Sequence, residues 1–279
     1  MLKQEFIKMV TNTAFYAAIF SIVIILLLGV AYTSPLTGEE FTVLDFIISD
    51  NQNELLEASD LRESDLIARG IESYLDMFLP IIAVIPFVAV VCGEKKNNNT
   101  RFEIYRVGKT RYVAGKYMAA MITGGCITVT GFLLFCLLIL PVFPDGVRET
   151  VEIQNEFLIQ ETVITGRLFK TFGIAGIYIM KFIRMFLYGA FVTVPALGLS
   201  VIIKNRYMIL SIPFMGFYLL RKVIEKRVDA DLYYFLPDMI GNAYVTEWVR
   251  LLVIYGSVSI MVFLWYRIYM GRKCDCGED

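Results

Sequence analysis

Histidine is absent from this chain of 279 residues. Its absence excludes His-based general acid–base catalysis, His-containing catalytic triads and His-ligated metal sites. Cysteine is scarce, and Cys92, Cys126 and Cys136 lie in or beside apolar runs, where a free thiol behaves as a small hydrophobic group. We therefore expect no disulfide framework. Cys274 and Cys276 could bind a soft metal, but no second cysteine pair completes a zinc site, so a solvated tail is the favoured interpretation.

Apolar residues dominate what is present. They make up 57% of the chain, and the mean hydropathy is +0.62, whereas soluble globular domains are about 45–50% apolar. A soluble fold could not bury that much apolar surface. The composition therefore predicts that lipid surrounds most of the chain.

Six apolar runs predict an all-α polytopic membrane protein, a multi-pass protein of the cell membrane. The first run is interpreted as an uncleaved span, with a cleaved signal peptide as the alternative. The fifth run has a helical length of only about 21 Å, against a hydrocarbon core of roughly 30 Å. Pro80 and Pro86 predict a kinked or broken helix in the second, and Gly124 and Gly125 permit close helix approach in the third. Residues 171–180 either lengthen the fourth span or lie along the interface. The runs are residues 13–31, 77–92, 117–140, 182–203, 207–220 and 248–270.

The distribution of charge predicts the orientation. The segment 91–118 carries seven Lys or Arg against two acids, and such short basic loops stay on the cytoplasmic side. Residues 32–76 carry eleven acids, so they form an outer acidic loop with amphipathic helices. Both termini are then cytoplasmic, 93–116 is a cytoplasmic coupling loop, and 221–247 is an outer re-entrant segment.

Two short amphipathic helices are predicted at the inner surface. Residues 1–12 form an interfacial helix with Phe6 and Ile7 on its apolar side and Glu5 and Lys8 on its polar side. Within the basic segment, apolar and basic residues recur at helical spacing from Thr100, and Gly108 supplies a stop.

Several charged residues along the chain are candidates for binding chemistry. The Gly108-Lys109-Thr110 sequence resembles the end of a phosphate-binding loop, but Glu103 stands where the first glycine belongs, so we expect no ATP site. Lys181 and Arg184 lie at the outer end of the fourth span. They either face a pathway or extend to the outer head groups.

With this layout, the chain resembles the permease subunit of a type-2 ABC exporter. In that family an acidic residue follows the second span, and a coupling helix, an Arg-containing turn and a Lys that opens the third span come next. Here Glu94, the segment 101–107, Arg111 and Lys116 stand in those places, and Asn99 replaces a family glycine. Lys95, Lys96 and Lys116 would hold the inner membrane boundary.

The resemblance implies a permease without an ATPase site, hence no enzyme in itself. It binds no cofactor, since ATP and Mg belong to a cytoplasmic ABC ATPase, present in two copies. A second permease, identical or homologous, would complete the unit, and the mechanism would be alternating access. No nucleic acid is involved. The ATPase would dock on the coupling helix and on Phe6 and Ile7 of the interfacial helix. The coupling-helix contacts are Thr100, Phe102, Glu103, Tyr105, Arg106 and Val107.

Acidic outer regions and aromatic-rich spans favour amphipathic, antimicrobial-type peptides as the exported substrate. Efflux of ions or small drugs by the same architecture is the alternative. A membrane sensor without a dedicated ATPase is a further alternative. An intramembrane enzyme is disfavoured because the predicted spans lack paired Asp, Ser-Lys or His clusters at mid-depth.

Overall fold

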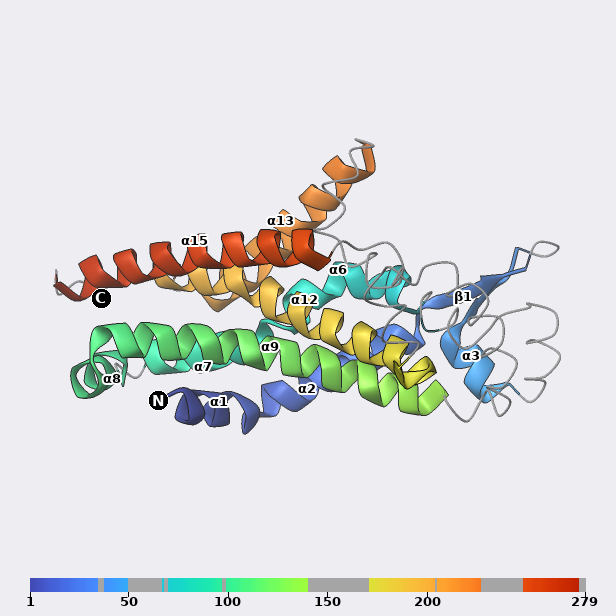
Figure 1. The fold of residues 1–279 in the computed structure, drawn as a ribbon, viewed down its shortest axis with the longest axis horizontal. Coiled ribbons are helices and arrows are strands. Elements are labelled where there is room, and N and C mark those ends of the chain that lie inside the picture. The colour runs from blue at the N-terminus through green and yellow to red at the C-terminus, as the bar shows by residue number, and fades with distance from the viewer. Residues whose placement is uncertain are drawn as a thin grey trace.

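The structure is a computed structural model that describes residues 1–34, 38–49, 67, 70–96, 99–139, 171–203, 205–226 and 248–275. It is mostly helical, and the long helices lie side by side in one elongated bundle. Both termini and helix α8 lie at the same end of the bundle, at the left of Figure 1. The short strands lie at the opposite end.

Four helical segments of the described chain are long and apolar enough to cross a membrane. A fifth candidate is the bent pair of α1 and α2, whose axes differ by 62°. The chain therefore has the helices of a membrane-embedded protein. Four of the six predicted runs each coincide with one of these candidate spans. The four segments are Met77–Glu94, Lys109–Ile139, Tyr178–Ile202 and Leu252–Tyr269.

The first run is shorter as a helix than its apolar length suggests. Helix α1 (Leu2–Val10) precedes α2 (Thr13–Leu27), which begins where the Asn12 side chain accepts a hydrogen bond from the Ala14 amide at 3.0 Å. From Val30 the chain instead forms strand β1 (Val30–Thr33), antiparallel to β2 (Glu40–Thr42). Aromatic and β-branched residues favour this pairing. The acidic loop therefore begins with a strand pair, which the sequence did not predict.

Helix α3 (Val43–Ile48) follows the strands and is capped by Thr42 and Asp45. A π-helical turn, η1 (Ile71–Leu75), then leads into α6 (Asp76–Ile82) and α7 (Ile85–Lys96). The break between α6 and α7 confirms the predicted kink. Its cause is Pro86, which has no N–H to donate to the carbonyl of Ile82. About half of the predicted acidic loop, including residues 50–66, lies outside the described residues.

Helices α8 (Asn99–Val107) and α9 (Lys109–Ile139) meet at Gly108, whose φ of +87° favours glycine. The small helix and its stop thus occur where the sequence predicts them. Helix α9 begins eight residues before the predicted span at 117–140. Its 31 residues extend about 46 Å, so it is longer than the hydrocarbon core is thick.

Helix α12 (Ile174–Ile202) includes most of residues 171–180, so this stretch lengthens the fourth helix. Helix α13 (Arg206–Lys226) continues past the predicted end at 220, because the charged residues there are good helix formers. Helix α13 is not among the candidate spans found in the described residues. The rest of the re-entrant segment lies outside the described residues. Helix α15 (Trp248–Asp275) is the last element.

The closest helix crossing joins α9 and α12. A Cβ added to Gly124 would lie 2.7 Å from the Gly189 carbonyl oxygen, and one added to Gly189 would lie 2.3 Å from Thr128 Oγ1. Thr128 Oγ1 in turn donates a hydrogen bond to the Met185 carbonyl at 2.9 Å. Small residues that let two backbones approach are typical of helix contacts in membranes. The crossing confirms the close approach predicted at Gly124.

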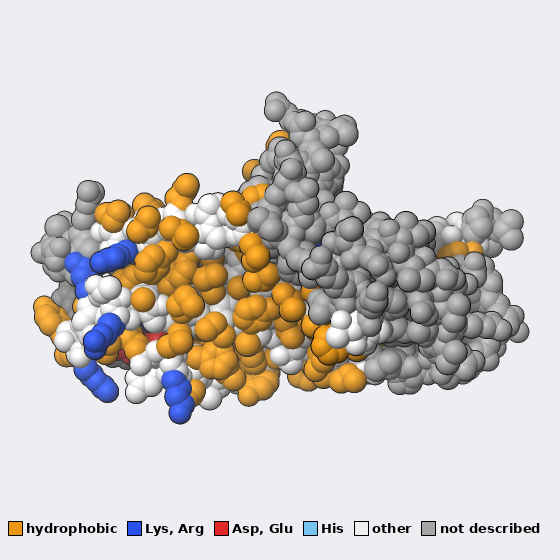
Figure 2. All heavy atoms as spheres, in the orientation of Figure 1, with side chains coloured by type: hydrophobic (Ala, Val, Ile, Leu, Met, Phe, Trp, Pro, Cys, Tyr) orange, Lys and Arg blue, Asp and Glu red, His pale blue; other side chains and the backbone are white. Residues whose placement is uncertain are grey.

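The outer surface fits a lipid environment. Figure 2 shows hydrophobic side chains over the middle of the visible face and Lys and Arg side chains gathered at the left end. That end holds α8, the start of α9 and the end of α15. Helix α15 contributes many of the exposed apolar side chains, among them Val253, Ile260 and Met261, which are 62–70% exposed.

Candidate functional site

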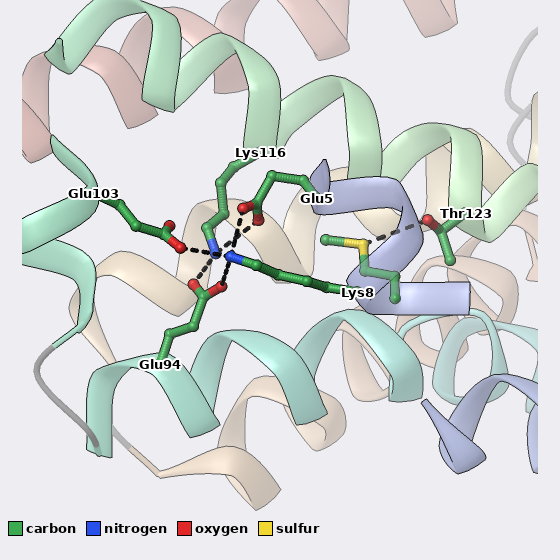
Figure 3. Close-up of polar contacts among 7 residues, drawn as sticks. Glu5, Lys8, Glu94, Glu103, Lys116 and Thr123 are labelled. Carbon is green, nitrogen blue, oxygen red and sulfur yellow. Dashed lines mark hydrogen bonds and ion pairs between the residues drawn. The ribbon is translucent and has the colours of Figure 1, made fainter. Parts of the chain in front are cut away.

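Five charged side chains from four helices meet at the basic end of the bundle (Figure 3). Glu5 and Lys8 come from α1, Glu94 from the last turns of α7, Glu103 from α8 and Lys116 from the first half of α9. We call this group the charge cluster. It is the only place in the described chain where three carboxylates converge within 4.8 Å of one another.

Lys8 holds the three acids together. Its Nζ lies 2.5 Å from Glu103 Oε1, 2.9 Å from Glu5 Oε1 and 3.2 Å from Glu94 Oε1. The Lys8 side chain is 39% exposed and that of Glu103 is 27% exposed, so water reaches this side of the cluster. The contact with Glu103 directly connects α1 to α8.

Lys116 forms the buried side of the cluster. Its Nζ lies 3.1 Å from Glu5 Oε2 and also donates a hydrogen bond to Glu94 Oε2. Lys116 is 1% exposed and Glu5 is 2% exposed. The Lys116 ammonium also lies 5.4 Å from the centre of the Tyr112 ring, which is a favourable cation–π distance. Buried charges persist only when they are paired in this way.

The ion pairs shift the pKa values of Glu5 and Lys8, the two charged α1 residues of the cluster. Burial would raise the pKa of Glu5, but Lys116 and Lys8 outweigh burial and hold that pKa below its usual value. Burial would lower the pKa of Lys8, but hydrogen bonds to Glu103 and Glu5 outweigh it and raise that pKa. Both side chains are therefore charged at neutral pH. With three carboxylic acids and two lysines, the cluster has a formal charge of −1.

Three converging carboxylates are also the donor set of a hard divalent cation. Here the ammonium groups of Lys8 and Lys116 already contact these oxygens and neutralise most of their charge. A divalent cation would have to displace two lysines. We therefore interpret the cluster as an ion-pair network between four helices.

Two of the predicted docking residues on α8 are highly exposed. Phe102 is 75% exposed and Tyr105 is 90% exposed, while Arg106 beside them is also exposed. Val107 is partly buried. The side chain of Thr100 lies outside the described residues, as do those of Lys95 and Lys96.

Glu103 and Lys116 form ion pairs that the sequence did not predict. Glu103 is directed inward to Lys8, so it joins α8 to α1 instead of adding to the exposed face of α8. Lys116 lies inside the bundle, and its place at the inner membrane boundary stays a prediction. It is buried because Glu5 and Glu94 offer it two carboxylates inside the bundle.

Helix α1 turns an acid into the bundle, which the sequence did not predict. Its apolar residues Leu2 and Ile7 are 41% and 46% exposed, and Phe6 is partly buried, whereas the acid Glu5 points into the bundle. The reason is the ion pairing of Glu5, which is possible only inside. Met9 is also buried, and its sulfur accepts a hydrogen bond from Thr123 Oγ1 at 3.3 Å (Figure 3).

Lys181 and Arg184, predicted to face a pathway or to reach the outer head groups, are only 5% and 3% exposed. Because α12 begins at Ile174, both lie well inside that helix. Lys181 Nζ lies 5.6 Å from the centre of the Tyr178 ring. A role along a pathway stays a prediction.

The sequence contained weak signals for the charge cluster. Glu5 and Lys8 have the i, i+3 spacing of a helical ion pair, and Glu94 and Lys116 are charges at the ends of apolar runs. Nothing in the sequence paired residues that are 86 or 95 positions apart. In comparisons with known proteins, no protein-family model, no curated protein and no solved structure matches this chain.

Proposed function

We propose that this chain is the permease subunit of an ATP-driven exporter of the type-2 ABC kind, and that a cytoplasmic ATPase docks on α8. The observation that carries the proposal is the exposure of two neighbouring aromatic rings, Phe102 and Tyr105, on a short helix at the basic end of a membrane bundle. Exposed aromatic and arginine side chains are the usual anchors of protein–protein interfaces. Arg106 completes such a set on α8.

The charge cluster supports the proposal because it gives α8 a mechanical connection to the bundle. A force on α8 would reach α1 through the ion pair of Glu103 with Lys8. It would reach α7 and α9 through Glu94 and Lys116, which share the same cluster. ATP-driven closure of two ATPases would thus move several spans together, as alternating access requires.

The proposed layout has six spans with both termini in the cytoplasm. They are α2, the broken pair α6 and α7, and then α9, α12, α13 and α15. Helix α1 lies at the inner interface, and the segment after α13 re-enters the outer leaflet. The gathering of Lys and Arg at the end that holds α8 and both termini agrees with this orientation.

The working unit would contain two permeases and two ATPases. The second and fifth spans of the facing permeases would open or close a central path. The proposed substrate is an amphipathic, antimicrobial-type peptide, because cationic peptides suit the two acidic outer regions of the sequence. Efflux of ions or small drugs would use the same parts.

Purification of the tagged chain from its native membrane tests the proposal directly. We expect an ATP-binding subunit to co-purify in equal amount, with ATPase activity in the complex. Recovery without any ATP-binding partner would favour the membrane sensor instead. A deletion strain tests the substrate, and unchanged peptide secretion together with unchanged sensitivity to cationic peptides would contradict peptide export.

A further inference from the structure

A pocket of about 400 Å³ opens at the basic end of the bundle, between the start of α9 and the last turns of α15. Its polar lining comes from Lys109, Thr110 and Arg267. Its apolar lining comes from Val113, Leu264 and Ile268. The charge cluster shares none of these residues.

The pocket offers two cationic groups and a hydroxyl group together. Arg267 is exposed and Lys109 is partly exposed, so both can reach a ligand that enters from the surface. Thr110 lies in the first turn of α9, where backbone N–H groups lack helical partners and favour an anion. Among the residues that the structure describes, no Asp or Glu lines the pocket. This chemistry fits a phosphate group.

The apolar lining continues onto the outer surface. Leu264 and Ile268 are 49% and 58% exposed, while Val113 forms a buried wall of the pocket. A free phosphate would gain nothing from these side chains. A molecule with a phosphate head and a hydrocarbon chain would contact both parts of the lining.

The pocket also lies where two candidate spans share an end. One candidate span begins at Lys109 and another ends at Tyr269, so the pocket is at the shared end of two spans. Basic pockets between spanning helices on the cytoplasmic side are typical binding sites for anionic lipid head groups.

We propose that this pocket binds an anionic phospholipid, with its phosphate between Lys109 and Arg267 and an acyl chain along Leu264 and Ile268. The proposal depends on the chain lying in a membrane but not on the docking of an ATPase. Bound lipid would link the start of α9 to the end of α15 beside α8.

Lipid binding to the purified full-length chain tests the proposal. The probes are phosphatidylglycerol and phosphatidylcholine with identical acyl chains, measured by native mass spectrometry in neutral detergent. We expect the wild type to prefer phosphatidylglycerol. A basic residue near an anionic lipid contributes about 1 kcal/mol, so Lys109→Gln and Arg267→Gln should each weaken that binding about fivefold. Arg267→Lys should retain most of it.

Lys3→Gln is the matched control, because Lys3 is an exposed cation of α1 outside the pocket. Its binding of phosphatidylglycerol should equal that of the wild type. Equal affinities for the two lipids, an equal loss in Lys3→Gln, or no loss in the pocket variants would overturn the proposal. Thermal melting of each variant checks that it is folded.

A competition experiment distinguishes lipid from free phosphate. Inorganic phosphate and glycerol phosphate carry the anionic group without acyl chains, so neither should displace phosphatidylglycerol at equal concentration. Displacement would assign the pocket to a soluble phosphate compound and overturn the lipid assignment. No ATP or ATPase is present, so failure here is separate from failure of the proposed function.

Discussion

The Lys8 ammonium lies 2.5 Å from the Glu103 carboxylate, although the two residues are 95 positions apart in the chain. This pair joins the first helix to the helix that presents Phe102 and Tyr105. In the proposed exporter, α1 and α8 therefore move together when an ATPase acts on α8.

A double-mutant cycle of Lys8→Gln and Glu103→Gln tests this connection. Because both side chains are partly exposed, we expect a coupling free energy of about 0.5–1 kcal/mol in denaturant unfolding. Each single variant should also lower transport per ATP hydrolysed. If the two changes in unfolding free energy are strictly additive and transport per ATP equals that of the wild type, the ion pair does not couple α1 to α8.

The buried side of the cluster should matter more for stability. Lys116→Met leaves Glu5 and Glu94 with Lys8 as their remaining partner, so we expect a loss of about 3 kcal/mol in the free energy of unfolding. Adding Glu94→Gln to Lys116→Met should recover part of the loss, since Lys8 then has one buried carboxylate fewer to neutralise. An unchanged unfolding curve for Lys116→Met would contradict the buried pairing.

The crossing of α9 and α12 should not accept a single added methyl group. In Gly124→Ala, the new Cβ would lie 2.3 Å from Thr193 Cγ2 and 2.7 Å from the Gly189 carbonyl oxygen. Such overpacking costs about 1–3 kcal/mol, and thermal melting measures it.

Gly216→Ala in α13 is the control for Gly124→Ala, because a Cβ there has no neighbour within 4 Å. Alanine favours the helix by about 0.5–1 kcal/mol over glycine, so this variant should be slightly more stable than the wild type. Equal melting temperatures for the two alanine variants would contradict the close crossing.

The exposed face of α8 should decide ATPase binding. Phe102→Ala and Arg106→Glu each remove a candidate anchor, so we expect ATPase affinity to fall by about 2 kcal/mol, or roughly thirtyfold. ATP hydrolysis should become uncoupled from transport while the melting temperature stays unchanged. Tyr207→Ala removes a 63% exposed aromatic ring from the start of α13 and serves as the control. Normal affinity in both α8 variants would place the docking site elsewhere.

The sequence predicted local features well where local chemistry controls them. Pro86 marks the break before α7, Gly108 ends α8, and Gly124 marks the close helix crossing. Each depends on the backbone of the residue itself, on a missing N–H, a positive φ or an absent Cβ. The amphipathic pattern of α1 was less informative, because it did not predict that Glu5 faces inward.

By itself, the sequence determined that the chain is helical, largely apolar and long enough to cross a membrane several times, because run length and hydropathy are local properties. Only the tertiary structure decided which charges meet. Glu5, Lys8, Glu94, Glu103 and Lys116 form one cluster because four helices pack at one end of the bundle. A buried charge persists there only when it has a partner of opposite charge. Packing sets the distance between the partners, whatever their separation along the chain.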